Sequence, residues 1–312
     1  MQNFVPRIWA IGGGKGGTGK SFFTGSLGFL LAEQGHRTVM VDLDLGAANL
    51  HTLVGLPHPE RGIADFLHRR VADLAATIVP TPHPRLGLIS GAMNNLDMPN
   101  IPHEQKMKLM RHLTRLPCDY VLLDLGAGTA YNTIDFFMIA DLGIFVTTPE
   151  PTAIENIYRL IRSVYIRKIH QILKTHHFKL FAKEAEAHNP LATVSNPDVL
   201  LEIIARLDPE KSAALEAALE AFEFKLAINQ LHKRDSRNIG PLICNIVGKH
   251  LGMNIEPLGN IIFDDRVHHA VCNRVPFLKL YPYAQTATQL RECCRQLLAA
   301  NGAASAFQRV VN

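Results

Sequence analysis

The sequence is short of the features that mark membrane, secreted and disulfide-linked proteins. Its 312 residues contain no apolar run of about 18 residues, so a membrane-spanning helix is not expected. The opening residues, MQNFVPRI, lack the charged, apolar and cleavage regions of a secretory signal. The cysteines have no CxxC spacing and no disulfide-like pattern, which indicates a reducing, cytoplasmic environment. They are Cys118, Cys244, Cys272, Cys293 and Cys294.

Charge is also scarce and nearly balanced, whereas apolar residues are abundant. Charged residues make up 19% of the chain and hydrophobic residues 47%, which is typical of a globular protein and excludes a disordered one. The net charge of +4 is too small to indicate a polyanionic partner by itself. We see no internal repeat and no low-complexity linker, so residues 1–312 are predicted to form a single domain.

Short apolar runs alternate with helical patterns along most of the chain. Continuous apolar runs are expected of parallel strands that are covered on both faces. The alternation predicts an α/β fold with a doubly wound, mostly parallel sheet. The predicted strands are Arg7–Gly12, Thr38–Leu43, Leu86–Ser90, Tyr120–Leu125, Leu142–Thr147, Leu226–Asn229 and Leu258–Ile262, and the clearest helices are Lys20–Gln34 and His103–Leu116.

Residues 154–223 interrupt this alternation and are predicted to be a helical insertion. No acid occurs from Asn156 to Lys183, whereas the second half of the segment is acidic. The basic helix could meet nucleic acid, anionic lipid or an acidic protein, or the two charge blocks could pair with each other, which we favour. The bases are Arg159, Arg162, Arg167, Lys168, Lys174, Lys179 and Lys183, and the acids are Glu184, Glu186, Glu202, Glu210, Glu216, Glu220 and Glu223.

A glycine-rich loop between the first strand and the first helix fits the G-x-x-x-x-G-K-[ST] pattern of phosphate-binding loops. Backbone N–H groups of such a loop and the positive end of the helix dipole hold phosphates, and the bland alternative is an ordinary glycine-rich turn. Lys20 is expected to contact the β- and γ-phosphates of ATP, and the Ser21 hydroxyl to ligate Mg²⁺. The pattern covers Gly14, Lys15, Gly16, Gly17, Thr18, Gly19, Lys20 and Ser21, and Phe22 follows it.

Three aspartates end two of the predicted strands: Asp42, Asp44 and Asp124. Ligands of open parallel sheets bind beyond the carboxyl ends of the strands, so these acids are expected on the same edge as the loop. One carboxylate can hold the water shell of a metal ion, and another can orient an attacking water. The alternative is that each aspartate only caps the turn that follows it.

The loop contains a lysine, Lys15, in addition to the phosphate-contacting Lys20, and this extra lysine resembles a feature of a known family. KGGTGKS resembles the deviant Walker A motif of the MinD/ParA family of P-loop ATPases, which implies that Lys15 reaches the nucleotide of a second subunit. VDLDLGAANLHTLVGL and LLDLGAG resemble switch I and switch II, which implies that Asp44 helps to activate water and that Asp124, with Asp42, lies near the metal. AINQ matches the place where Asn229 would read adenine.

Two further stretches, TTPEPTAIENIYRLI and PFLKLYPYAQTA, resemble the FlhG branch of this family, the MinD-like ATPases that set flagellar number and placement. The residues before the first strand do not match the DQAxxLR-type motif of that branch, so stimulation of an FlhF-like GTPase by that route is not expected. Phe22 stands where the family usually has threonine near the α-phosphate, so that contact would use the backbone alone.

The resemblance implies a cytoplasmic Mg²⁺-dependent ATPase that forms an ATP-dependent homodimer and hydrolyses ATP slowly to time its binding to a protein partner. The insertion is expected to contact that partner. Phe307–Val311 in the tail has helical apolar spacing but little charge, so a weak peripheral contact with the inner membrane face stays open, as does weak DNA binding. The alternatives are an iron–sulfur or other metal-centre carrier, a ParA-like DNA-associated ATPase, and a nucleotide-binding scaffold with negligible turnover.

Overall fold

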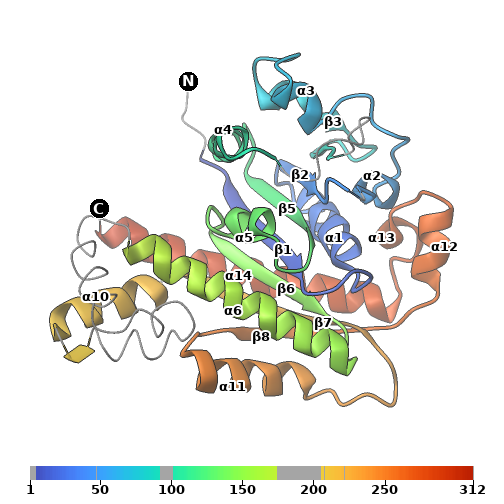
Figure 1. Ribbon diagram of the computed structural model, residues 1–312. Helices are drawn as coiled ribbons and strands as arrows, with labels where there is room; N and C mark the ends of the chain where they lie inside the picture. Colours follow the sequence, from blue (N-terminus) through green and yellow to red (C-terminus); the bar gives the residue numbers. More distant parts are fainter. Residues whose placement is uncertain are drawn as a thin grey trace.

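A computed structural model describes residues 5–46, 48–91, 101–173, 205–206, 208–220 and 222–311. Eight strands form one sheet in the order β3-β4-β2-β5-β1-β6-β7-β8, and all neighbours are parallel except the short pair β3–β4 (Figure 1). The sheet confirms the predicted α/β fold with a mostly parallel sheet. The strands are β1 (Arg7–Gly13), β2 (Thr38–Leu43), β3 (Val79–Pro80), β4 (Leu86–Ile89), β5 (Tyr120–Ala127), β6 (Leu142–Thr147), β7 (Glu223–Leu231) and β8 (Glu256–Ile262).

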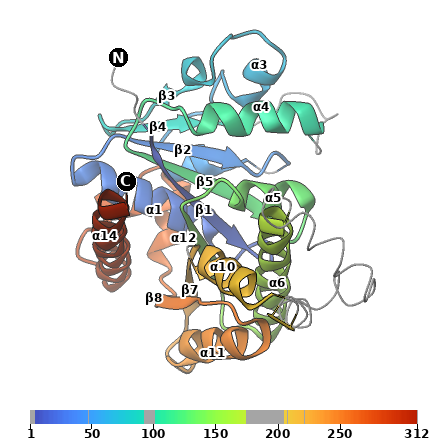
Figure 2. The same ribbon diagram turned by 90° about the vertical axis from the view of Figure 1, so that its left-hand side faces the viewer.

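Helices cover both faces of the sheet (Figure 2). On one face lie α1 (Lys20–Glu33) and α14 (Gln285–Val311), and on the other lie α4 (His103–Leu113), α5 (Tyr131–Phe137), α6 (Pro151–Leu173) and α11 (Ile239–Leu251). The shorter elements are α2 (Leu50–Leu53), α3 (Ile63–Leu67), η1 (Leu74–Thr77), α10 (Pro209–Glu220), α12 (Arg266–Cys272) and α13 (Phe277–Leu280).

The continuous apolar runs become strands because alternate side chains enter two separate cores. In β5, Val121 and Leu123 belong to the core under α4, α5 and α6, whereas Tyr120 and Leu122 belong to the core under α1 and α14. Side chains of a strand alternate between faces, so a strand buried on both faces must be apolar throughout. β2 and β6 have the bounds that the sequence predicted.

β7 begins earlier than predicted. Glu223 pairs with Leu142 and Lys225 with Ile144, so the strand is in register from its first residue. The sequence analysis placed the start of this strand at Leu226, because Glu223 and Lys225 interrupt the apolar run before it. The Lys225 ammonium forms an ion pair of 2.5 Å with Glu256 on β8, which gives the charge of Lys225 a partner on the neighbouring strand.

The first helix of the predicted insertion belongs to the core of the domain. In α6, Ile157, Leu160, Ile161 and Val164 are fully buried against the sheet. The predicted start at residue 154 therefore lies inside a crossover helix that a parallel β6–β7 connection requires. Most of the remaining segment, including Lys174, Lys179, Lys183, Glu184, Glu186 and Glu202, lies outside the described residues, so the boundaries of an insertion stay a prediction.

Two of the basic residues of α6, Arg167 and Lys168, are engaged within the domain, whereas Arg159 and Arg162 are exposed. Arg167 donates two hydrogen bonds, of 2.9 and 2.6 Å, to Asp135 on α5 rather than to the acidic second half of the segment, so the favoured pairing is wrong for this residue. Lys168 is only 1% exposed, and its ammonium lies 3.4 Å from the centre of the Phe222 ring. Burial lowers the pKa of Lys168 to about 7.

The C-terminal tail continues as helix. α14 runs to Val311 and includes the stretch Phe307–Val311, but the side chains of that stretch lie outside the described residues. In the part of the chain that the structure describes, none of the helices combines the length and the apolar composition needed to cross a bilayer.

Candidate nucleotide-binding site

The glycine-rich loop joins the end of β1 to the start of α1, as the sequence predicted. Gly19 has a φ of 84°, and a Cβ added there would lie 2.1 Å from Nδ2 of Asn229. A Cβ on Gly14 would lie 2.2 Å from the backbone carbon of Asn156 in α6. Only glycine permits these two approaches, so the loop is packed between the end of β7 and the second turn of α6.

Two amides from the end of β7 hold the loop in place. The buried Asn229 donates from Nδ2 to the Thr18 carbonyl at 2.9 Å, and Gln230 donates from Nε2 to the Gly17 carbonyl at 2.9 Å. Gln230 has a φ of 56°, an uncommon conformation for a residue with a Cβ. In this arrangement the Asn229 amide nitrogen is engaged by the loop, and adenine reading by Asn229 stays a prediction. Sequence reasoning missed Gln230, although it adjoins Asn229.

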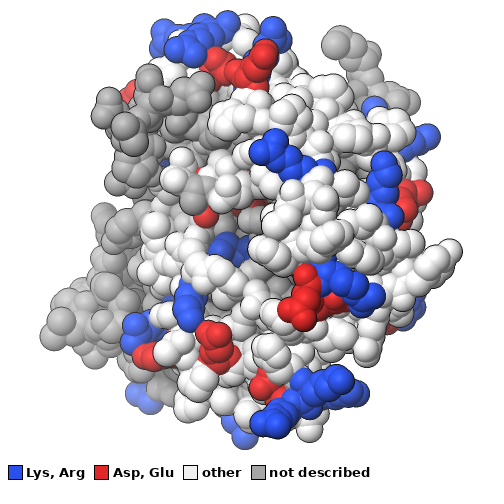
Figure 3. All heavy atoms as spheres, turned by 90° about the vertical axis from the view of Figure 1, so that its right-hand side faces the viewer, with Lys and Arg blue, Asp and Glu red and all other residues white. Residues whose placement is uncertain are grey.

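Lys20 lies in the floor of the site. It is 6% exposed, and its burial lowers its pKa, while the charges of Asp124 and Asp44 oppose that shift. Figure 3 shows lysine and arginine atoms deep in a hollow near the centre of the face that it presents. A buried ammonium that faces the carboxylates of two strands matches the position that a phosphate-contacting lysine needs.

Asp42 and Asp124 lie side by side at the carboxyl ends of two neighbouring strands. They are paired in the register of β2 and β5, and each is 1% exposed. Asp42 accepts hydrogen bonds from the backbone N–H groups of Asp44 at 3.2 Å and Leu50 at 3.0 Å. Burial, reinforced by the neighbouring carboxylate Asp124, raises the pKa of Asp42 to about 7.

The same edge has the composition of a magnesium site. Burial raises the pKa of Asp124 to about 6, against the lowering effects of Ser21, Lys20 and Thr24. Two buried carboxylates and a serine hydroxyl are hard oxygen ligands of the kind that Mg²⁺ prefers. Because both carboxylates are ionised only at the cost of burial and mutual repulsion, a divalent cation at this edge would favour their charged forms. These residues therefore fit the predicted cofactor.

Thr24 is a site residue that sequence reasoning missed. Its hydroxyl lies 3.1 Å from Oδ1 of Asp124 and 3.0 Å from the carbonyl oxygen of Lys20. Thr24 stands four residues after Lys20, on the same side of α1, so helical spacing was the signal that could have identified it. The hydroxyl fixes the orientation of the Asp124 carboxylate.

Asp44 lies between the ends of β2 and β5. It is half-buried, and its Oδ1 atom lies 3.6 Å from the position that a Cβ on Gly126 would occupy. The two segments that resemble switch I and switch II are therefore in contact at this residue. The structure brings Asp44, Asp42, Asp124 and Lys20 to one edge of the sheet, as the sequence predicted.

Lys15 has a different environment from Lys20. Its ammonium forms an ion pair of 2.9 Å with Oε2 of Glu150, and the two side chains are 43% and 60% exposed. Glu150 lies just before α6, within the TTPEP stretch, and sequence reasoning gave it no role. An exposed ion pair of this kind contributes little to stability, so Lys15 can leave it at low cost.

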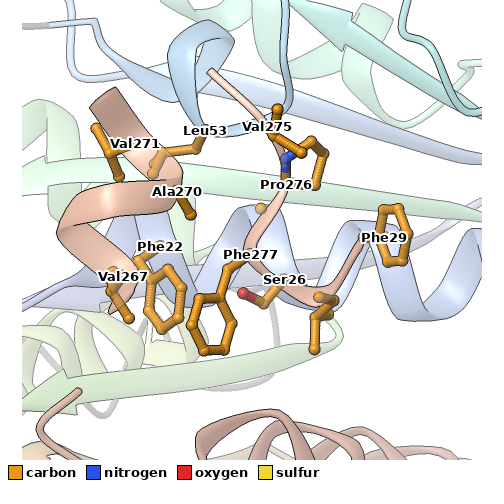
Figure 4. A pocket seen from close by; sticks show the side chains of 12 residues that line it. Phe22, Ser26, Phe29, Leu53, Val267, Ala270, Val271, Val275, Pro276 and Phe277 are labelled. Carbon is orange, nitrogen blue, oxygen red and sulfur yellow. The ribbon is translucent and has the colours of Figure 1, made fainter. Parts of the chain in front are cut away.

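Phe22 turns its side chain away from the loop. Its ring packs edge-on against Phe277 with centroids 5.5 Å apart, in an apolar pocket formed by α1, α12 and α13 (Figure 4). Because the Phe22 side chain packs here, only the backbone of this residue could contact a phosphate.

Residues 9–277 match the family model described as the CobQ/CobB/MinD/ParA nucleotide-binding domain. The chain belongs to this family. The resemblance inferred from the loop is thereby confirmed, and the roles of the individual site residues stay predictions.

Two curated relatives of MinD/ParA type illustrate the similarity. The septum site-determining protein MinD of Synechocystis is 33% identical over 156 residues, covering 50% of this chain and 58% of that protein. The antiactivator FleN of Pseudomonas aeruginosa is 30% identical over 158 residues, covering 50% of this chain and 55% of that protein. The chain thus spans little more than half the length of these relatives.

Solved structures of MinD and ParA proteins share the fold. MinD of Pyrococcus horikoshii, complexed with Mg-ADP, superposes with a TM-score of 0.63 at 19% identity, covering 96% of this chain and 98% of that one. A ParA family ATPase of Chlorobium tepidum gives a TM-score of 0.63 at 17% identity, covering 94% and 99% of the two chains. At these identities the comparison establishes the fold alone.

Proposed function

We propose that this MinD/ParA family protein is an ATP-driven dimerisation switch, in which slow ATP hydrolysis controls the binding of a partner. The observation that carries the proposal is the contrast between the two loop lysines. Lys20 is buried beside Asp124 and Asp44, whereas Lys15 is exposed and, among the described residues, forms its ion pair with Glu150. One lysine suits the chain's own nucleotide, and the other is available to the nucleotide of a second subunit.

Each residue of the site has a distinct part in the proposed hydrolysis. The loop N–H groups and Lys20 bind the β- and γ-phosphates, and Ser21, Asp42 and Asp124 hold Mg²⁺. The metal, when bound, neutralises charge on the phosphate oxygens. Asp44 orients the attacking water. Lys15 of the opposite subunit stabilises negative charge on the transferring phosphoryl group, as an arginine finger does.

The segment 154–223 remains our proposal for the partner-reading surface. The support is the close approach of Asn156 in α6 to Gly14. Because the two backbones are tightly packed, a shift of the glycine-rich loop would displace that helix. We propose a protein partner, because MinD of Aquifex aeolicus was solved in a complex with MinC. The proposed role in placing flagella or other polar machinery follows from the resemblance of TTPEPTAIENIYRLI and PFLKLYPYAQTA to the FlhG branch. Arg167 and Lys168 are engaged within the domain, which favours a protein partner over DNA.

A role as a metal-centre carrier receives less support from the cysteines. Cys118, Cys244, Cys293 and Cys294 are buried, and Cys272 is exposed. A carrier must present thiolates to its cargo, and burial raises the pKa of each of these four buried thiols, which disfavours the thiolate form.

We also propose that the protein acts in the cytoplasm, and that any contact with the membrane is peripheral.

Light scattering tests the switch. The Asp44→Ala variant with Mg-ATP should have the mass of a dimer, because it is expected to bind ATP without consuming it. Adding Lys15→Ala should return it to a monomer, whereas adding Lys249→Ala, which removes an exposed lysine of α11, should not. An equal dimer fraction with ADP or without nucleotide would contradict ATP control.

A further inference from the structure

A cavity of about 320 Å³ lies on the α1 side of the sheet, away from the glycine-rich loop. Its apolar lining includes Phe29 of the third turn of α1, Val54 after α2, Leu86 at the start of β4 and Pro276 before α13. It adjoins the apolar pocket of Figure 4, with which it shares Phe29, Val275 and Pro276. Its volume is at the lower end of the range of small-molecule sites.

Two cations stand at the cavity without acidic partners. Arg274 and Lys279 line it and are exposed, and neither forms an ion pair with a carboxylate in the described part of the chain. Arg274 has a φ of 51°, because it is the left-handed residue that ends α12: the N–H of Val275 donates to the Ala270 carbonyl at 3.1 Å, and the N–H of Arg274 donates to the Val271 carbonyl at 3.0 Å. The Arg274 carbonyl oxygen lies 3.0 Å from the position of a Cβ on Gly55, so the backbone packs tightly there.

We infer that this cavity binds a small amphipathic carboxylate, such as a medium-chain fatty acid. The apolar lining suits the hydrocarbon chain, and the unpaired guanidinium and ammonium groups suit the carboxylate. A cavity of about 320 Å³ can take up one short hydrocarbon chain, so the ligand that we infer is a single-chain molecule. Pockets of this composition take their affinity from the apolar part and their orientation from a few polar groups.

The cavity is connected to the nucleotide site through α2. Val54 and Gly55 line the cavity at the end of that helix, and the N–H of Leu50 at its start donates to Asp42. A ligand that displaces the end of this single turn would disturb the carboxylate that we assign to Mg²⁺. Binding should therefore alter nucleotide affinity, and this second effect rests on the proposed function.

Calorimetric titration of the full chain with decanoate tests the site, with decanol and acetate as probes that lack the charge and the chain. Decanoate should bind more tightly than either. Lys279→Gln and Arg274→Asn should each weaken binding about tenfold, the effect of losing one charged hydrogen bond. Asparagine tolerates the left-handed backbone at position 274, and Lys249→Gln on α11 is the matched control.

Equal binding of decanol and decanoate, or equal binding by the Lys279→Gln and Lys249→Gln proteins, would overturn the assignment. In a separate measurement, saturating decanoate should change the nucleotide dissociation constant of the wild type. An unchanged constant in protein that binds decanoate would overturn the coupling through α2. Failure of the protein to bind ATP at all would instead count against the proposed function.

Discussion

Replacing Asp44 with alanine should slow ATP hydrolysis about 10²–10³-fold while ATP binding is retained. Asp44 lies at the contact between the ends of β2 and β5 but is only half-buried, so its loss removes a charged group from the reacting edge without opening the core. Phosphate release under single-turnover conditions measures the rate, and a fluorescent ATP analogue measures the affinity.

Two comparisons make this result specific. Lys20→Ala should lose nucleotide affinity itself, because it removes the buried cation that faces the phosphates. Glu104→Ala, which removes an exposed carboxylate from the first turn of α4, should leave both measurements unchanged. Hydrolysis by Asp44→Ala at the wild-type rate would exclude Asp44 from the mechanism.

Replacing Asp135 with alanine should lower the free energy of unfolding by about 3 kcal/mol. The Asp135 carboxylate on α5 forms ion pairs with Lys106 on α4 and Arg167 on α6, and the Lys106 and Asp135 side chains are 7% and 10% exposed. Without Asp135, the buried ammonium of Lys106 keeps one hydrogen-bond acceptor among the described residues, Oδ1 of Asn132 at 3.1 Å. The expected loss is at the lower end of the range for buried pairs because Arg167 is 39% exposed.

Urea denaturation measures this loss, and the pair Glu155–Arg159 supplies the control. Both of its side chains are more than half exposed on α6, so Glu155→Ala should change the free energy of unfolding by less than about 0.5 kcal/mol. Similar effects of Asp135→Ala and Glu155→Ala would show that the three-helix cluster does not stabilise the fold.

The cluster of Asp135, Lys106 and Arg167 also bears on the switch that we propose. Only residues 128–130 separate β5, which carries Asp124, from α5, which carries Asp135. A helix fixed to both α4 and α6 gives this short connection a defined end, which a loop that responds to the γ-phosphate needs.

The sequence predicted the sheet and the phosphate loop because both depend on local pattern. Apolar runs covered on two faces define β2 and β6, and the glycine spacing defines the loop whatever the rest of the chain does. Asp42 and Asp124 could also be placed together, because parallel strands bring their carboxyl ends to one edge.

The contacts that sequence reasoning missed join residues far apart in the chain. Gln230 binds the Gly17 carbonyl across 213 residues, and Lys15 meets Glu150 across 135. The hydrophobic period of a single helix or strand does not predict which distant residue a side chain will contact. The partner of Arg167 was mispredicted for the same reason. The blocks of charge in the sequence suggested pairing with an acidic helix that follows in the chain, whereas Arg167 donates to Asp135 on α5.

Lys168 is a different case, because its burial could have been read from the sequence. It stands four residues after Val164 and four before Ile172, within the apolar stripe of α6 that faces the core. We counted it among surface bases because of its charge, although helical spacing is the stronger indicator of which face a residue occupies.

The central claim is that Lys15 acts on the nucleotide of the opposite subunit, and a mixing experiment tests it most directly. Lys15→Ala and Asp44→Ala proteins should each hydrolyse ATP poorly. A mixed dimer contains one site in which an intact Asp44 meets an intact Lys15 from the other subunit. Lys15→Ala should not form homodimers of its own, so mixing it with Asp44→Ala before ATP is added should raise hydrolysis well above the sum of the two separate variants. Random pairing would give about one quarter of wild-type activity, since half of the dimers would be mixed and each has one intact site. Hydrolysis that stays at the sum of the two separate variants, although an affinity tag on one variant retains the untagged other variant in the presence of ATP, would contradict the account.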